Sequence, residues 1–257
     1  MKEPLIFDIA MGRTKPFNMK NETIRCPFCD TSKLTDILDR DGHIIWLMNK
    51  FPVLRDTWPT VIIETEGDEG ELSTLPIDEA TRIIDFGRAK WRETMSSKEF
   101  TSVLFFKNHG PMSGGSLRHP HSQIIGLKNY DYHQDITPNH MKGWLLHEDQ
   151  NVYITLSTHP IIGFFEYNLR YKPTAPSRAI TLRLQQTIRF VLHNLAQFSQ
   201  SYNYFFYDLN DGYEYIKVVP RYVAPPLYVG YQITQTCDDE RAAQILKDIT
   251  PFFELTT

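Results

Sequence analysis

The sequence predicts an α+β fold in which helices pack on antiparallel sheets. Two segments with helical periodicity are each followed by short apolar segments of strand length, and a strong turn signal joins the strands of the second set. The chain has 257 residues, enough for a substantial core in one large domain or two small ones. Because helix and paired strands occur in the same order twice, the pattern indicates an internal duplication.

Four segments of the first half have the composition of β-strands. They are short, rich in β-branched or aromatic residues, and bounded by turn residues. They cover residues 44–48, 61–64, 103–106 and 123–127. We expect these segments to form one antiparallel sheet.

Three segments have the period of an amphipathic helix. In residues 76–98, apolar side chains recur at steps of three and four, and Asp78 and Glu79 occupy the first turn, where negative charge is favourable. Residues 177–201 repeat this pattern. Residues 238–253 predict a third helix, which we expect to end near Pro251.

Two further strands are predicted in the second half, at residues 204–209 and 213–219. Asn210-Asp211-Gly212 separates them and is a strong signal for a β-hairpin. The helix at 177–201 is therefore followed by paired strands, like the helix at 76–98.

The most informative stretch places His119, His121 and Gln123 at alternate positions. If residues 118–126 are extended, these three side chains share one face of a strand. The preceding loop is suited to wrap an anion, because glycine permits the positive φ angles that turn successive N–H groups inward. Its candidate residues are Asn108, Gly110, Ser113, Gly114, Gly115 and Ser116. An imidazole beside a bound phosphate can attack phosphorus, so the stretch predicts a phosphate site with a nucleophile.

The run His119-Pro120-His121-Ser122-Gln123 resembles the histidine-triad superfamily. It is most similar to the branch that contains galactose-1-phosphate uridylyltransferase and related dinucleoside-polyphosphate and nucleotide-sugar phosphorylases. Hydrolases of the superfamily carry a third histidine where this chain has Gln123. A lone H-x-H is more often a strand with surface histidines. Here the run is accompanied by further features of that branch, each in its expected place. They are Asn108-His109-Gly110, the SGGS run at 113–116 and Gln123.

The resemblance implies roles for residues outside this run. Residues 12–17 look like a basic segment that meets nucleotide phosphates, through Arg13, and residues 49–54 look like the segment that packs on base and ribose, through Asn49 and Phe51. The segments at 60–65, 159–166 and 215–221 resemble core strands. His121 is then the nucleophile, and Gln123 donates hydrogen bonds to phosphate oxygens.

Cys26 and Cys29 form a C-x-x-C pair that can present two thiolates to one Zn²⁺ ion. The resemblance makes His119 a third ligand. The family's fourth ligand, a histidine, is replaced by an acidic segment in which Asp68 and Glu71 are the two candidates, with Asp68 preferred. A redox pair and a degenerate site with buried cysteines are the alternatives.

The second copy of the duplicated histidine-triad-like unit has Tyr213, Tyr215 and Lys217 where histidines would stand. Uridylyltransferases can hold iron in that half, and without those ligands we expect no iron. The predicted halves are residues 1–150, which are catalytic, and 151–257, which serve as scaffold and substrate wall.

Charge and hydropathy restrict the function further. The formal charge of −4 and pI near 6.1 disfavour a nucleic-acid partner. There is no secretory signal and no apolar run of the roughly 20 residues that a membrane span needs, so we expect a cytoplasmic protein.

The sequence thus predicts a nucleotidyltransferase that works through a covalent nucleotidyl-histidine. Its donor is a nucleoside diphosphate sugar or a dinucleoside polyphosphate, with uracil or adenine as base, and its acceptor is phosphorylated. A homodimer is one expected assembly. A hydrolase of nucleotide conjugates and a non-catalytic nucleotide-binding protein are the alternatives.

Overall fold

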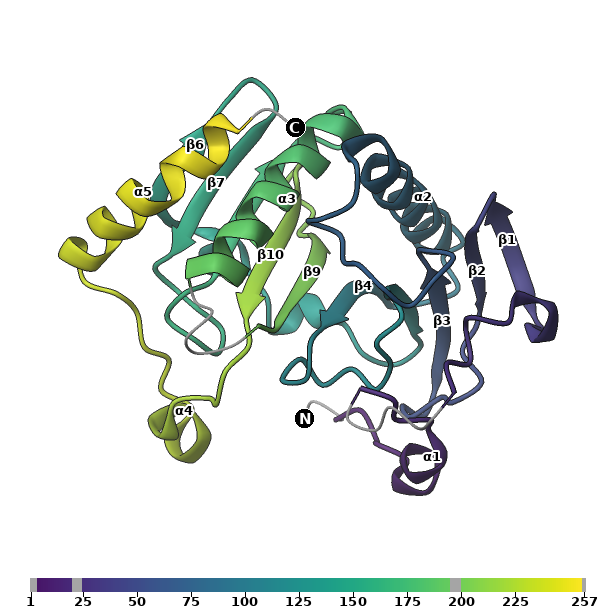
Figure 1. Ribbon diagram of the computed structural model, residues 1–257. Coiled ribbons are helices and arrows are strands. Elements are labelled where there is room, and N and C mark those ends of the chain that lie inside the picture. Colours follow the sequence, from purple (N-terminus) through teal and green to yellow (C-terminus); the bar gives the residue numbers. More distant parts are fainter. Residues whose placement is uncertain (1–3, 20–24, 195–199, 256–257) are drawn as a thin grey trace. The chain divides into compact units, whose positions relative to one another are not determined.

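The computed structural model describes residues 4–19, 25–194 and 200–255 (Figure 1). The chain divides into two compact units. Unit 1 comprises Met1–Glu71 and Arg82–Tyr132, and unit 2 comprises Leu72–Thr81 and His133–Thr257. The predicted α+β class, with antiparallel sheets and packed helices, is confirmed. A boundary at residue 150 would separate two strands that pair with each other, and the units divide after Tyr132 instead.

The sheet of unit 1 has the strand order β1-β2-β3-β5-β4, and these neighbouring strands pair antiparallel. Its strands are β1 (Ile37–Asp41), β2 (Ile44–Met48), β3 (Thr57–Ile63), β4 (Ser102–His109) and β5 (His121–Leu127). The expected sheet of four segments is therefore confirmed, with β1 added at its edge. Two short helices, α1 (Ile9–Thr14) and the 3-10 turn η1 (Thr31–Lys33), precede β1.

The long helix α2 (Ile77–Ser96) covers one face of this sheet. The indole Nε1 of Trp91 donates to the carbonyl of Val103 over 3.0 Å, and a Cβ atom on Gly87 would lie 2.5 Å from the ring of Phe105. Val103 and Phe105 therefore face the helix. Since side chains alternate along a strand, the neighbouring positions of β4 and β5 lie on the opposite, uncovered face.

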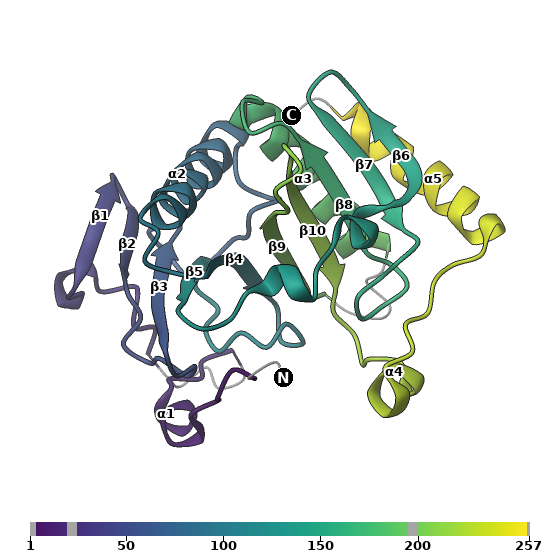
Figure 2. The ribbon, with the colours of Figure 1, turned by 180° about the vertical axis from the view of Figure 1, so that it is seen from behind.

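Unit 2 repeats the arrangement with the strand order β6-β7-β8-β10-β9 (Figure 2). Its strands are β6 (Gly143–Glu148), β7 (Val152–Ser157), β8 (Tyr167–Tyr171), β9 (Tyr202–Asp208) and β10 (Glu214–Pro220). In each unit a helix follows the third strand and precedes the last pair. This common order confirms the duplication. Short 3-10 turns η2 (Tyr132–Gln134) and η3 (Pro138–Met141) precede β6.

Helices α3 (Ser177–Asn194) and α5 (Asp239–Glu254) pack against each other and against the sheet of unit 2. Positions 195–199 of the helix predicted at 177–201 lie outside the described residues. Helix α5 matches the predicted range of 238–253 to within one residue at each end, but it continues past the expected end near Pro251, because the last turn is held by tertiary contacts. Phe253 is buried, and its carbonyl accepts hydrogen bonds from Arg183 and Gln186.

Residues 159–166 form a loop rather than the expected core strand. The carboxylate of Glu166 accepts hydrogen bonds from three successive backbone N–H groups of this loop, at 2.7 to 3.0 Å. These bonds turn the chain around the carboxylate just before β8. Glu166 thereby fixes the connection between β7 and β8.

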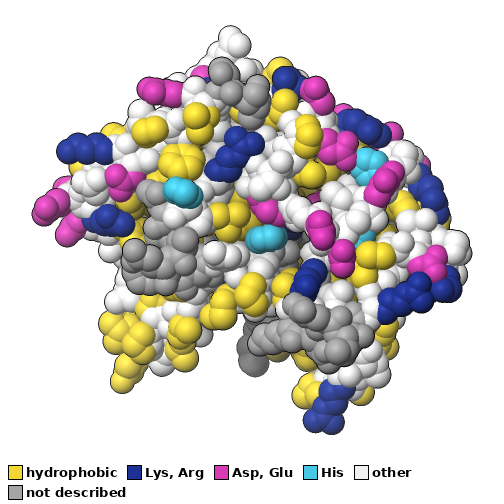
Figure 3. Space-filling view, viewed as in Figure 1, with side chains coloured by type: hydrophobic (Ala, Val, Ile, Leu, Met, Phe, Trp, Pro, Cys, Tyr) yellow, Lys and Arg dark blue, Asp and Glu magenta, His cyan; other side chains and the backbone are white. Residues whose placement is uncertain are grey.

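The small helix α4 (Pro226–Tyr231) contributes no buried residue. Its apolar side chains lie at the surface and are visible as a yellow group at the lower left of Figure 3. Leu227, Val229 and Tyr231 are 44%, 70% and 76% exposed. In the described part of the chain, no helix is long and apolar enough to span a bilayer.

A buried ion pair joins Lys217 of β10 to Glu166. The Nζ atom of Lys217 lies 3.1 Å from Oε2 of Glu166, both side chains are 0% exposed, and Nζ also donates to the carbonyl of His140 over 2.9 Å. Burial lowers the pKa of Lys217, and Glu166 opposes that shift. The ammonium group of Lys217 therefore supplies the buried positive charge beside the Glu166 carboxylate.

We predict that Lys217→Met destabilises the protein by about 3–5 kcal/mol, because it leaves the Glu166 carboxylate buried without its cation. Urea unfolding followed by circular dichroism measures the loss. Lys172→Met, at an exposed position of the same unit, is the matched control and should change stability little. Equal midpoints for the two variants would contradict the assignment of a stabilising role to the pair.

Candidate functional site

His121 begins β5 on the sheet face that α2 leaves uncovered. Its Nδ1 atom lies 2.7 Å from the backbone carbonyl of His119. A carbonyl oxygen only accepts, so Nδ1 carries the proton and Nε2 of the neutral ring keeps its lone pair. Burial lowers the pKa of His121 to about 4, against the opposing effect of this hydrogen bond. The ring is therefore neutral at pH 7, with an unprotonated nitrogen.

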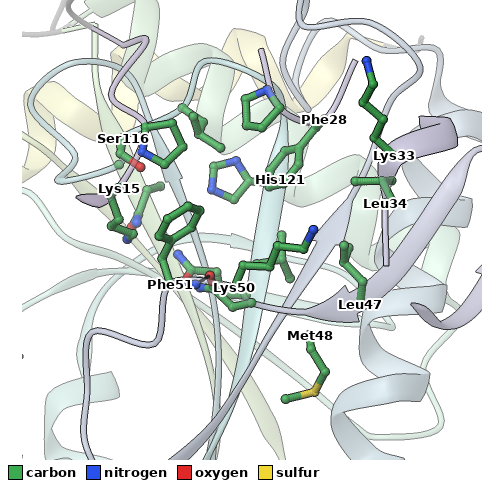
Figure 4. Close-up of a pocket in the computed structure, with 18 of the residues that line it drawn as sticks. Lys15, Phe28, Lys33, Leu34, Leu47, Met48, Lys50, Phe51, Ser116 and His121 are labelled. Carbon is green, nitrogen blue, oxygen red and sulfur yellow. Dashed lines mark hydrogen bonds between the residues drawn. The ribbon is translucent and has the colours of Figure 1, made fainter. Parts of the chain in front are cut away.

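A cavity opens in front of His121 (Figure 4). Its wall includes basic, amide and apolar groups that come from several separate segments of unit 1. The lining residues are Lys15, Pro16, Pro27, Phe28, Lys33, Leu34, Leu47, Met48, Asn49, Lys50, Phe51, Val61, Asn108, Gly114, Gly115, Ser116, Leu117, His121 and Gln123.

The apolar wall of the cavity rests on the core of unit 1. Leu47 and Val61 belong to the buried cluster on the uncovered face, and Phe28 and Leu34 pack against that cluster. The ring of Phe28 meets the ring of His121 edge to face, with centroids 5.6 Å apart. A flat aromatic or heterocyclic group can be bound against such a wall.

The polar part of the cavity is suited to a phosphorylated ligand. Lys15, Lys33 and Lys50 line it, and burial lowers the pKa of Lys15. Gln123 follows His121 by two positions and so shares its face. Ammonium and amide groups are donors that bind phosphate oxygens.

The loop between β4 and β5 is closed by its own hydrogen bonds. Ser113 Oγ donates to the carbonyl of Gly110 over 2.6 Å and accepts from the N–H of Gly115 over 3.2 Å. Gly110 and Gly114 have φ angles of 82° and 85°, as expected for glycines in an anion-binding loop. The loop is also tied to the N-terminal segment, since Asn18 Oδ1 accepts from the N–H of Arg118 over 2.9 Å.

The cavity brings together most of the residues predicted for the phosphates and nucleoside. Asn49, Phe51, Asn108, Gly114, Gly115, Ser116, His121 and Gln123 line it. Arg13 is exposed on α1 and is not among the lining residues, whereas Gly110 and Ser113 shape the loop behind it.

Sequence reasoning did not identify Phe28, Lys33 or Lys50 as part of this cavity. Phe28 lies inside the C-x-x-C motif and Lys50 lies between Asn49 and Phe51, so their positions offered a signal. Lys33 lies on η1 and has no motif around it.

Beside the cavity, Cys26, Cys29 and His119 form a candidate metal site. Their ligand atoms all lie within 4.8 Å of one another, and Nδ1 of His119 is 3.4 Å and 3.6 Å from the two sulfur atoms. Nε2 of His119 donates to the carbonyl of Thr65 over 2.8 Å, which leaves Nδ1 unprotonated toward the sulfurs. Two sulfurs and an imidazole nitrogen are donors typical of tetrahedral zinc sites, so the residues fit such an ion.

Asp68 and Glu71 differ in their relation to these three residues. Burial lowers the pKa of His119, and the hydrogen bond to Thr65 and the negative charge of Asp68 oppose that shift. The pKa of Cys29 is raised to about 12, by desolvation first, then by Cys26 and by Asp68. Neither carboxylate belongs to the group of ligand atoms that lie within 4.8 Å of one another. Asp68 is exposed, whereas Glu71 is buried, at 7% exposure.

A second buried ion pair lies behind the two histidines. Lys107 of β4 pairs with Glu64, and both side chains are at most 1% exposed. Lys107 also pairs in register with Ser122, which stands between His121 and Gln123. Burial is the main cause that lowers the pKa of both His119 and His121, and the charge of Lys107 adds to it, whereas the charge of Glu64 raises the pKa of His119.

Two family models match successive parts of the chain. A model of the DUF4931 N-terminal domain, a domain of unknown function, matches residues 7–130, and one of the DUF4931 C-terminal domain matches residues 133–250. A DUF4931 family protein from Bacillus cereus ATCC 10987 has 39% identity in its crystal structure, with a TM-score of 0.74 over 84% of this chain and 100% of that chain.

Two further proteins are similar at lower identity. Galactose-1-phosphate uridylyltransferase of Streptomyces lividans is 25% identical over 127 residues, which are 48% of this chain and 36% of that protein. The chain thus aligns with about a third of this curated relative. An ADP-glucose phosphorylase from Arabidopsis thaliana, solved with bound ADP-glucose, has 14% identity and a TM-score of 0.72, covering 94% and 93% of the two chains. The latter likeness shows a common fold.

Proposed function

The chain belongs to the DUF4931 family, and we propose that it is a nucleotidyltransferase that carries the nucleotidyl group covalently on His121. The donor is a nucleoside diphosphate sugar or a dinucleoside polyphosphate, and the acceptor is a phosphate. One observation supports this above all. A neutral imidazole has its free nitrogen beside a cavity that combines lysines, a glycine-rich loop and an apolar wall.

The reaction proceeds in two displacements. The lone pair of His121 Nε2 attacks the α-phosphorus of the donor, a phosphorus–nitrogen bond forms, and the bond to the bridging oxygen breaks, so that a phosphate anion departs. An oxygen of the acceptor phosphate then attacks the same phosphorus, and the phosphorus–nitrogen bond breaks. The second step restores His121 with its proton still on Nδ1.

The hydrogen bond from Nδ1 to the His119 carbonyl stabilises the positive charge that the ring acquires on attack. Gln123 donates to the phosphate oxygens while charge is redistributed, and Lys15 and Lys50 offset the negative charge of the donor. A neutral amide at position 123 cannot protonate a leaving group. The amide suffices here because the group that leaves the donor and the acceptor that attacks are both phosphate anions.

The nucleoside lies at the apolar end of the cavity in this proposal. Phe51 and Phe28 supply aromatic surface for the base, and the side-chain oxygen of Asn49 accepts from the N–H of Phe51 over 2.9 Å, which holds this turn in place. Asn108 and Ser116 lie near the loop and bind phosphate oxygens. Arg13, being exposed, is a weaker candidate for this role.

Zinc is the ion that we propose for Cys26, Cys29 and His119, with Asp68 as fourth ligand. When bound, the ion contributes a structural cross-link and takes no part in the displacement. His119 has two roles in this arrangement. Its ring would hold the ion, and its carbonyl orients the nucleophile, so the cross-link fixes the position of His121.

Labelling tests the mechanism. Protein mixed with UDP-glucose, ADP-glucose or a diadenosine polyphosphate, each labelled at the α-phosphorus and given without acceptor, should retain label in an acid-labile, base-stable linkage. His121→Asn should abolish the label and keep donor binding, because the imidazole supplies chemistry. His193→Asn, on an exposed position of α3, is the control. Wild-type labelling of His121→Asn would rule out the covalent route through this residue.

Replacing Gln123 by His distinguishes transfer from hydrolysis. The new imidazole can titrate and donate a proton, so the variant should release more free nucleotide from the donor in the absence of acceptor. Chromatography of the products measures the ratio. An unchanged ratio would show that the amide does not set the choice between acceptor and water.

Phe51→Ala should weaken nucleotide binding by about 1–3 kcal/mol, the usual value of a base–aromatic stack. Calorimetric titration with UMP and AMP measures the change. Phe7→Ala is the matched control, since Phe7 is 56% exposed and does not line the cavity. If both variants bind every tested nucleotide as the wild type does, the base does not stack on Phe51.

Protein purified without chelator should contain about one zinc per chain, and elemental analysis should find no iron. Cys26→Ser should lose the metal, and Cys237→Ser, at the remaining cysteine, should keep it. Asp68→Asn should lower zinc affinity more than Glu71→Gln, because Asp68 bears on both Cys29 and His119. Wild-type protein without zinc would refute the assignment.

A further inference from the structure

Unit 2 has a cavity on the sheet face that α3 leaves uncovered, which is the face turned to the viewer in Figure 2. Tyr167 of β8 packs its ring against Phe190 of α3, with centroids 5.9 Å apart. Asn168 and Arg170 flank Leu169 on the same strand and, by alternation, lie on the other face. The cavity that they line has a volume of about 210 Å³.

This position corresponds to that of the proposed active site in unit 1. Each sheet has the same strand order, and each cavity lies on the face away from the helix that follows the third strand. The lining in unit 2 is different. It consists of Pro138, Met141, Lys142, Tyr153, Thr155, Asn168, Arg170, Asp211 and Tyr215.

The arginine of this cavity is held in place by two aromatic rings. The guanidinium carbon of Arg170 lies 4.5 Å from the ring centre of Tyr153 and 4.9 Å from that of Tyr213. Among the described residues, no carboxylate forms an ion pair with it. A guanidinium that stacks on aromatic faces keeps the N–H groups of its edge available, and that edge matches the oxygens of a phosphate.

A second polar group of the cavity lacks a partner. Asn168 is 1% exposed, and its Nδ2 donates to Thr155 Oγ1 over 3.1 Å, but its Oδ1 is buried and accepts no hydrogen bond. A buried acceptor without a donor is costly, so such a group in a native protein points to a missing partner. A ligand hydroxyl group supplies the donor that Oδ1 lacks.

The charged side chains of the lining indicate which charge the ligand should carry. Arg170 and Lys142 are positive, and Asp211 is the single acidic residue of the lining. Asp211 accepts a hydrogen bond from the Tyr215 hydroxyl over 2.6 Å and is thereby partly satisfied. An anion fits this charge.

We propose that this cavity is a second ligand site, for a small phosphate monoester that also carries hydroxyl groups, such as a sugar phosphate. Arg170 binds the phosphate through the edge of its guanidinium, Lys142 adds a second positive charge, and a ligand hydroxyl donates to Asn168 Oδ1. The site is independent of the nucleotidyl transfer proposed for unit 1, and it binds its ligand without chemistry.

Nuclear magnetic resonance of the wild-type protein tests the site directly. Titration with glucose 1-phosphate should shift, with saturation, the Arg170 Nε–H and Asn168 Nδ2 signals, whereas glucose alone should not shift them. The signal of Gln123, on the cavity of unit 1, is followed in the same spectra. Shifts confined to Gln123 and its neighbours would overturn the proposal, because the ester would then bind in unit 1 only.

Inorganic phosphate provides the second arm of the titration. It should bind at Arg170 more weakly than glucose 1-phosphate and leave the Asn168 signal nearly unchanged. Equal affinity for the two would overturn the assignment of a hydroxylated ligand.

Substitution of the arginine provides the third arm. Arg170→Gln should weaken the ester at this site at least about tenfold, as expected for the loss of charge-assisted hydrogen bonds. Arg178→Gln, at an exposed arginine of α3, is the control. Arg170→Lys keeps the charge without the bidentate edge and should show intermediate binding. Unchanged affinity in both Arg170 variants would refute the role of this side chain.

Discussion

The hydrogen bond from His121 Nδ1 to the carbonyl of His119 is the constraint on which the site depends. It fixes the tautomer, and so it determines which nitrogen keeps a lone pair beside the cavity. The carbonyl is itself placed by the His119 ring, which is anchored at Nε2 by Thr65 and faces two cysteines at Nδ1. Behind the strand, the positive charge of buried Lys107 adds to the effect of burial, which lowers the pKa of His121. Position, tautomer and charge of one imidazole thus rest on contacts from four segments.

The two units carry different functional side chains on corresponding faces of similar sheets. Unit 1 has a histidine and an amide on β5, with cations supplied by loops. In unit 2, β10 carries Tyr215 and Lys217, and the ammonium of Lys217 is bound to Glu166 and to the carbonyl of His140. A fold with two such faces can keep one for covalent chemistry and use the other for binding, because each face is supported by its own helix. The duplication therefore gives each of the two proposed roles its own sheet and helix.

The fold was predictable from sequence where the local pattern and the tertiary environment agree. β2 is a continuous apolar run between turn residues, and its predicted bounds of 44–48 match the structure. β1 was missed because it is an edge strand whose side chains are mostly exposed, so its composition is polar. The end of α5 was misjudged because a proline is a local signal, whereas buried Phe253 and its hydrogen bonds are tertiary ones.

The same distinction between local signals and tertiary contacts applies to the candidate site. The array from His119 to Gln123 is contiguous, but Lys33 reaches the cavity only through the path of the folded chain.

The two-residue spacing of His119, His121 and Gln123 has a consequence for how this family can diverge. Loss or gain of one residue within the run would move every following side chain to the opposite face of the sheet, under α2. Such an indel would turn the imidazole that we propose as nucleophile away from the cavity even though each residue type remained. We therefore expect this segment to change by exchange of side chains in place. Changes of length are better tolerated in the loops around it, such as η1 and the turn at Asn49.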